Sequence, residues 1–151
     1  MNIFDKWNKS IDIEGLQKDI ADADNGSTGD YKEVPVGQYE VKIEKIELKE
    51  SSKHDPMVTM WFRILSGDFQ NSMIFLNQVI TQGFQISQMN RLLKSLEAVD
   101  ADTVEFRNYS QYNDLLMDIF ENVDGQLEFL LDYGKNKKGY STFKIVEVYN
   151  A

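Results

Sequence analysis

Residues 57–65, with the sequence MVTMWFRIL, constrain the fold of this chain more than any other stretch. Apolar side chains occupy every second position, and this period of two predicts a β-strand with one buried face. The opposite face then carries Trp61 beside Arg63, where a strand has no evident structural need for a large aromatic side chain. The positions expected to be buried are Val58, Met60, Phe62 and Ile64.

Two interpretations of Trp61 follow from this pattern. An indole beside a guanidinium on a sheet surface suits unpaired bases, because every base has a π-face and the cation attracts phosphate. Alternatively, Trp61 packs under a loop, under the N-terminal segment or into a contact between subunits. The strand by itself does not decide between them.

The 151 residues contain no cysteine, so the chain has neither a disulfide framework nor a thiolate metal site. No apolar run approaches the length of a membrane span, and the N-terminus lacks the apolar core of a signal peptide. These features predict one domain with a sizeable core, in a cytoplasmic protein without a membrane partner.

The net charge of −9 argues against a nucleic-acid partner, but the charges are unevenly distributed. Residues 97–132 contain ten acidic side chains and one basic side chain, whereas residues 133–146 contain four lysines and no acid. A locally basic surface on an acidic protein is therefore compatible with the sequence.

Residues 1–33 are expected to form a leader ahead of a core domain that spans residues 34–151. Within the leader, Ile13, Leu16 and Ile20 have helical spacing, and residues 22–30 are polar and rich in Gly and Ser. The leader is interpreted as a solvated, partly flexible arm with a short helix. The alternative is an arm that docks on a partner or on a neighbouring subunit.

The core domain shows five strand patterns and a helical insert. A one-residue shift of parity in the first strand predicts a β-bulge near Glu44–Lys45. The expected order is strand 39–48, strand 57–65, strand 73–80, helix 84–96, helix 110–122, strand 126–133 and strand 140–149.

Three meandering strands, a helical insert and a closing hairpin form the order of the OB-fold, a five-stranded barrel. The sequence therefore predicts a mainly β protein with helices between strands 3 and 4. An antiparallel sheet with a helix packed on one face is the alternative architecture.

The OB-fold would place several aromatic and basic residues on one surface, because strands 2–3 and the loops joining strands 1–2 and 4–5 bind oligonucleotides in that fold. Each feature also has a structural interpretation: strand 73–80 could be buried on both faces, and the lysine-rich turn 134–139 could be merely solvated. The residues expected to contact nucleic acid are Trp61, Arg63, Phe75, Lys42, Lys49, Lys53, Tyr133, Lys135, Lys137, Lys138 and Tyr140.

Catalysis finds no support in the sequence. His54, the single histidine, lies in a polar loop, and the chain lacks a cysteine nucleophile, a G-x-S-x-G motif, a P-loop and a His/carboxylate metal spacing. The acidic clusters are typical of solvated helix faces. The chain is expected to be no enzyme and to need no metal or cofactor.

Residues 34–96 resemble the core of small phage-encoded single-stranded-DNA-binding proteins from the replication and recombination modules of phages of Gram-positive bacteria. The resemblance lies in G-x-Y opening a long Lys/Glu strand, a short polar loop, the pattern M-x-x-x-x-F-x-I-L-x-G from Met57 to Gly67, and then an apolar strand and a helix. The C-terminal hairpin matches loosely.

This resemblance implies an OB-fold and sequence-tolerant binding of single-stranded DNA in phage DNA replication, recombination or repair, in the cytoplasm of an infected or lysogenic host. It points to Trp61, Arg63 and Phe75 on the barrel face. Phage replication or recombination proteins and a second copy of the chain are the further partners to consider. The alternative function is a protein-interaction adaptor in a phage replication or assembly complex that binds no nucleic acid.

Overall fold

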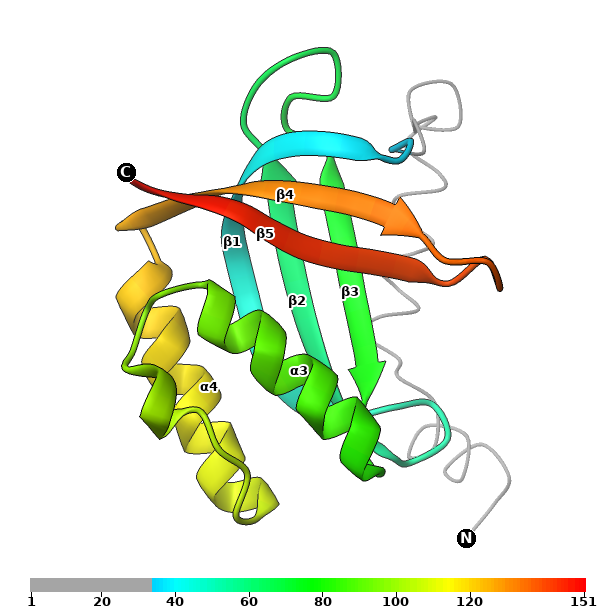
Figure 1. Cartoon of the computed structure of the whole chain (residues 1–151), viewed down its shortest axis with the longest axis vertical. Helices are drawn as coiled ribbons and strands as arrows, with labels where there is room; N and C mark the ends of the chain where they lie inside the picture. The colour runs from blue at the N-terminus through cyan, green and yellow to red at the C-terminus, as the bar shows by residue number, and fades with distance from the viewer. Residues whose placement is uncertain (1–33) are drawn as a thin grey trace, which may run out of the picture.

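The computed structural model of the protein describes residues 34–151 and confirms the predicted order of strands and helices (Figure 1). The leader, residues 1–33, lies outside the described residues, so its predicted helix and its boundary stay predictions. The elements are β1 (Gly37–Glu50), β2 (Pro56–Ile64), β3 (Met73–Val79), α3 (Gly83–Ser95), the 3-10 helix η1 (Ala101–Thr103), α4 (Tyr109–Val123), β4 (Leu127–Lys135) and β5 (Ser141–Asn150).

The five strands form one antiparallel sheet in the order β3-β2-β1-β4-β5. β1 pairs with β2 as far as Glu50 but with β4 only over Gly37–Val41, after which the two strands separate. The sheet consequently curls, and β4 and β5 cross in front of β2 and β3 (Figure 1). It remains open, because β3 and β5 are its two edges, so the predicted OB-fold barrel is not confirmed.

The predicted bulge in β1 is confirmed by a register shift between Ile43 and Lys45. Lys42 pairs with Arg63 before the shift, and Lys45 pairs with Trp61 after it. Since Arg63 and Trp61 lie two residues apart on β2, they share a face, and both lysines share that face with them. Without the bulge, two lysines three positions apart would point to opposite sides of the sheet.

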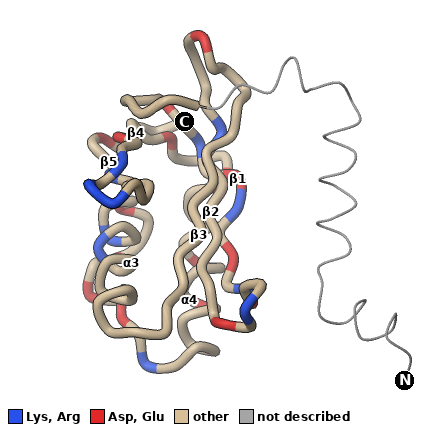
Figure 2. Tube along the Cα trace, turned by 90° about the vertical axis from the view of Figure 1, so that its right-hand side faces the viewer, with Lys and Arg blue, Asp and Glu red and all other residues tan. Residues whose placement is uncertain are grey.

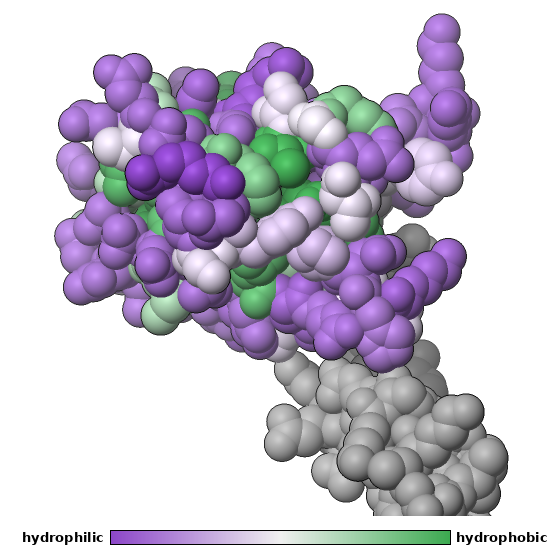
Figure 3. Space-filling model, turned by 90° about the horizontal axis from the view of Figure 1, so that it is seen from below, coloured by the Kyte–Doolittle hydropathy of each residue, from purple (hydrophilic) through white to green (hydrophobic). Residues whose placement is uncertain are grey.

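The core lies between the curled sheet and the two helices. The four apolar side chains predicted to be buried on β2 are all fully inaccessible to solvent. One of them, Phe62, stacks on Phe143 of β5 with ring centroids 6.0 Å apart, so β2 and β5 touch across the curl. At the end of the molecule seen in Figure 3, apolar residues gather in the centre and hydrophilic residues surround them.

Both helices are fixed by polar contacts as well as by packing. The Asn108 side chain caps α4 by accepting a hydrogen bond from the backbone N–H of Gln111 at 2.8 Å. The Tyr112 hydroxyl, buried on α4, donates to Asn90 Oδ1 of α3 at 2.5 Å, and burial raises the pKa of this phenol. Neither α3 nor α4, the two α-helices of the described residues, is long and apolar enough to cross a membrane.

Phe62→Ala should lower the free energy of unfolding by about 3–5 kcal/mol, because it removes a fully buried ring and its contact with Phe143. Phe75→Ala is the matched control, since Phe75 is 48% exposed on the neighbouring strand and should cost about 1 kcal/mol or less. Urea denaturation followed by far-UV circular dichroism measures both. An equal loss of unfolding free energy in both variants would contradict the assignment of Phe62 to the buried face and of Phe75 to the exposed face.

Candidate nucleic-acid interface

The surface of β1, β2 and β3 that points away from the core, here called the outer face, has an aromatic pair at its centre. Trp61 and Phe75 share this face, as predicted, and the β2–β3 register places them directly opposite each other. Their rings meet edge to face with centroids 5.6 Å apart. Phe75 and its neighbour Asn77 are exposed, so the alternative that β3 is buried on both faces is wrong.

Lys45 of β1 lies beside this pair, so the three side chains form a row across β1, β2 and β3. Its Nζ lies 4.6 Å from the centroid of the Trp61 ring, in a cation–π arrangement, and 2.7 Å from Oε2 of Glu47. The sequence-based list of site residues omitted Lys45. The signal was present, because the predicted bulge already implied that the residues after Glu44 change sides.

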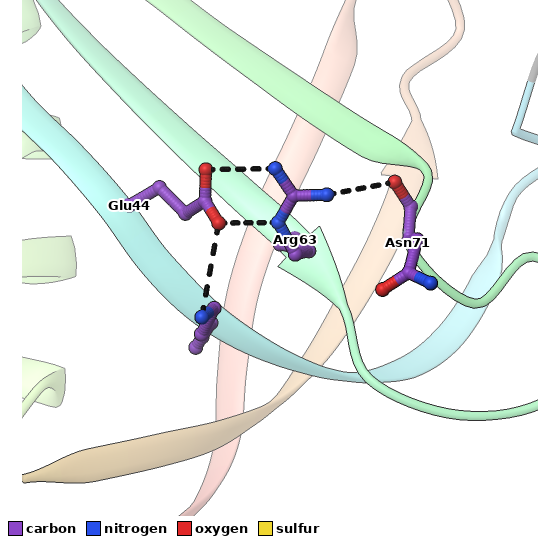
Figure 4. A network of polar contacts seen from close by, with 4 residues as sticks. Glu44, Arg63 and Asn71 are labelled. Carbon is purple, nitrogen blue, oxygen red and sulfur yellow. Dashed lines mark hydrogen bonds and ion pairs between the residues drawn. The ribbon is translucent and has the colours of Figure 1, made fainter. Parts of the chain in front are cut away.

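Arg63 lies on the outer face as predicted, but its guanidinium is engaged within the protein (Figure 4). Nε and Nη2 donate to the two carboxylate oxygens of Glu44, the latter bond measuring 3.0 Å, and Nη1 donates to the carbonyl of Asn71 at 3.1 Å. Lys42 lies 3.8 Å from the same carboxylate. A phosphate approaching Arg63 therefore has to compete with Glu44.

The pKa of Glu44 is lowered, chiefly by its hydrogen bonds from Arg63 and further by the charges of Arg63 and Lys42, against a smaller opposing effect of burial. The arginine and this carboxylate are about a third exposed or less. The outer face is thus a mixed surface, on which Glu44 and Glu47 hold cations beside the aromatic pair.

The predicted lysines near the loop between β1 and β2 lie at one end of the outer face. Lys49 is exposed and pairs in register with Met57, and Lys53 is exposed in the loop itself. Between this end and the aromatic pair, Thr59 is only 3% exposed and its hydroxyl donates to Asn77 Oδ1.

The loop between β4 and β5 lies apart from this face. It carries the exposed lysines 135, 137 and 138 together with Tyr140, which is 68% exposed. In Figure 2 this loop and the β1–β2 loop lie on opposite sides of β2 and β3. Tyr133 is half-buried and packs on Phe143 at 5.6 Å. The structure therefore groups Trp61, Phe75, Arg63, Lys42 and Lys49, and separates them from the β4–β5 loop.

His54 lies in the exposed β1–β2 loop, with Nδ1 2.5 Å from Oε1 of Glu50. Within residues 34–151, no group of three or more histidine, cysteine, aspartate or glutamate side chains is placed to hold a metal ion.

Comparison with known protein families matches residues 21–147 to a family described as a protein of unknown function (DUF669). The match begins within the leader and covers most of the chain. No curated protein matches the sequence.

Glu44→Gln should lower the free energy of unfolding by about 1 kcal/mol at neutral pH, because it removes the charge that Arg63 and Lys42 contact. Since the folded-state pKa of Glu44 is lowered, its stabilising effect is present above the ordinary value of about 4.3 and is lost as the pH falls through the lower folded value. Urea unfolding between pH 3 and pH 7 should show the two proteins converging at the acid end. Glu40→Gln, an exposed site on β1, is the control, and an equal loss there would contradict the pairing.

Proposed function

The chain belongs to the DUF669 family, whose description gives no function, and we propose that this member binds single-stranded DNA on its outer face. The observation that carries the proposal is the pair of Trp61 and the exposed Phe75 at the centre of a sheet surface that also bears Lys42, Lys45 and Arg63. Large aromatic side chains on an exposed sheet, flanked by cations, are the components from which sequence-tolerant stacking sites are built.

Binding in this scheme exchanges intramolecular contacts for contacts with the DNA. Phe75 offers an exposed ring to a base, whereas Lys45 lies over the Trp61 ring. A base that stacks on the indole displaces this ammonium, which then pairs with a phosphate nearby. Arg63 likewise exchanges a carboxylate of Glu44 for a phosphate of similar geometry.

The same proposal includes an OB-fold-like architecture. That fold is itself a partly open, five-stranded barrel with an oligonucleotide site on strands 2 and 3. The strand order, the strong curl and the contact between Phe62 and Phe143 across it support the likeness. The two helices between β3 and β4 occupy the position of the helical insert.

The biological setting that accompanies the proposal is DNA replication, recombination or repair of a phage, within the cytoplasm of its host. The protein acts by holding a single strand and carries out no reaction on it. Phage replication or recombination proteins are its candidate protein partners, and self-association would extend the binding surface along a strand.

The double variant Trp61→Ala/Phe75→Ala should bind an oligo-dT of about thirty nucleotides at least roughly thirtyfold more weakly than the unchanged chain, since two stacked bases at about 1–3 kcal/mol each are lost. Fluorescence anisotropy of labelled DNA at low salt measures the affinities. Phe84→Ala, which alters a 61% exposed ring on α3, is the matched control and should leave the affinity unchanged. Unchanged affinity in the folded double variant would remove the proposed site.

Quenching of tryptophan fluorescence gives a second readout. Because Trp7 also fluoresces, the titration is made in a Trp7→Phe background, in which only Trp61 reports. Quenching that weakens steeply with salt indicates indole stacking together with phosphate neutralisation.

Replacing Lys135, Lys137 and Lys138 with Ala tests whether the bound strand reaches the β4–β5 loop. If it does, three phosphate contacts are lost, and the slope of log K against log salt should become shallower by about 2. The loop lies away from the outer face, so only an oligonucleotide long enough to pass the edge of the sheet should show this change. An unaltered slope with thirty nucleotides would confine binding to the outer face.

A further inference from the structure

A groove separates the second half of β1 from α4 and borders the proposed DNA site at Lys45. It has a volume of about 540 Å³. Its strand side consists of residues 45–48, and its helix side includes Leu116, Met117 and Phe120. Met117 is 61% exposed, so its apolar side chain is accessible to a partner.

The strand side of the groove is the edge of β1. β4 leaves β1 after Val41, so from Lys42 to Glu50 the second edge of β1 has no strand neighbour among the described residues. Consecutive side chains of a strand point to opposite faces. A groove lined by four consecutive residues must therefore meet the backbone edge-on, where alternate N–H and C=O groups point away from β2.

This edge carries charged side chains at Lys45, Glu47 and Lys49, but it lacks one common protection against strand addition, a bulge within it. Natural edge strands are commonly interrupted by bulges, and β5, at the border of the sheet, has a register shift opposite Leu130 and Leu131. In β1 the bulge lies at one end of the free edge, and the register with β2 runs without interruption from Lys45 to Glu50. The edge beside α4 is regular and can accept a strand.

The charged side chains that line the groove indicate what kind of segment can bind there. Glu121 and Asp124 line it on α4, whereas its one lysine, Lys45, already pairs with Glu47. A second copy of the chain, with a net charge of −9, would be repelled by these acids over most of its surface, the β4–β5 loop excepted. The leader, with eight acidic and four basic residues, has the same unfavourable sign. Basic side chains from another protein complement the groove.

We propose that the groove binds an extended segment of a partner protein, which adds a strand to the free edge of β1. Alternate apolar side chains of the segment pack on Leu116, Met117 and Phe120, and the Lys or Arg residues between them point to the opposite face, toward Glu47. Backbone hydrogen bonds supply affinity and the apolar wall supplies specificity, as in other complexes formed by strand addition. The inference does not depend on DNA binding.

The test uses the full chain without DNA and a fluorescein-labelled peptide of about nine residues that alternates Val and Lys, a length matched to the free edge. Met117→Lys should weaken binding roughly tenfold or more, as expected for truncating a central apolar contact and adding a like charge. Phe84→Lys is the matched control, because Phe84 has the same 61% exposure on the other helix. It should leave the affinity within about twofold of the unchanged protein.

The backbone contribution is tested with the same peptide N-methylated at alternate residues, which keeps its charge and apolar side chains but cannot complete a strand ladder. It should bind much more weakly, and the unmodified peptide should slow amide hydrogen exchange in residues 42–50. Equal binding of both peptides, equal effects of the two variants, or no binding at about 1 mM would each overturn the proposal.

Amide hydrogen exchange in the free protein, measured at several protein concentrations, distinguishes the two other possible occupants of the groove, a second copy of the chain and the leader. Edge amides that are already protected in a concentration-dependent manner would identify a second copy of the chain as the occupant. Protection that is independent of concentration would identify the protein's own leader. Either result would overturn the proposal of a basic partner.

Discussion

The rest of the structure depends on the burial of one face of β2. Four consecutive even positions, from Val58 to Ile64, are excluded from solvent, and Phe62 reaches β5 across the curl of the sheet. In a strand, fixing one face fixes the other, because a slip of one residue would exchange every side chain between them. The position of Trp61 on the outer face is therefore a direct consequence of core packing.

Local features of the fold could be predicted from the sequence, because they depend on period and turn chemistry. The five strands, the two helices, the bulge in β1 and the outward position of Trp61 and Phe75 all follow from residue patterns within short windows. The closure of the sheet could not be predicted, because it depends on where β4 leaves β1, and the pattern of either strand alone carries no information about that point.

In the candidate site, too, the features that depend on local residue patterns could be predicted, and those that depend on contacts between distant residues could not. Outward parity identified Trp61, Arg63 and Lys42, but the sequence could not show that Arg63 is held by Glu44, because this contact joins residues nineteen positions apart in the chain. The prediction that the β4–β5 loop lies beside the aromatic pair depended on the OB-fold, in which both belong to one binding surface. In the open sheet it lies on the other side of β2 and β3.

If the outer face binds DNA as proposed, its acidic side chains determine which contacts an anionic strand has to displace. Glu44 and Glu47 occupy the cations that phosphates would otherwise contact, so the free protein satisfies its charges internally. Binding by exchange yields less energy than binding to unpaired cations, because each new contact replaces an existing one. Under the proposed function, stacking would then supply the larger share of the affinity.

Lys45 connects this face with the groove beside α4, since it lies over Trp61 and also lines the groove. Its partner Glu47 belongs to the same groove. A cation from a bound segment that approaches Glu47 would compete with Lys45 for the carboxylate. The released ammonium would then be available to a phosphate on the outer face. Under both proposals, the two ligands would bind with favourable coupling, and by linkage each would raise the affinity of the other by the same factor.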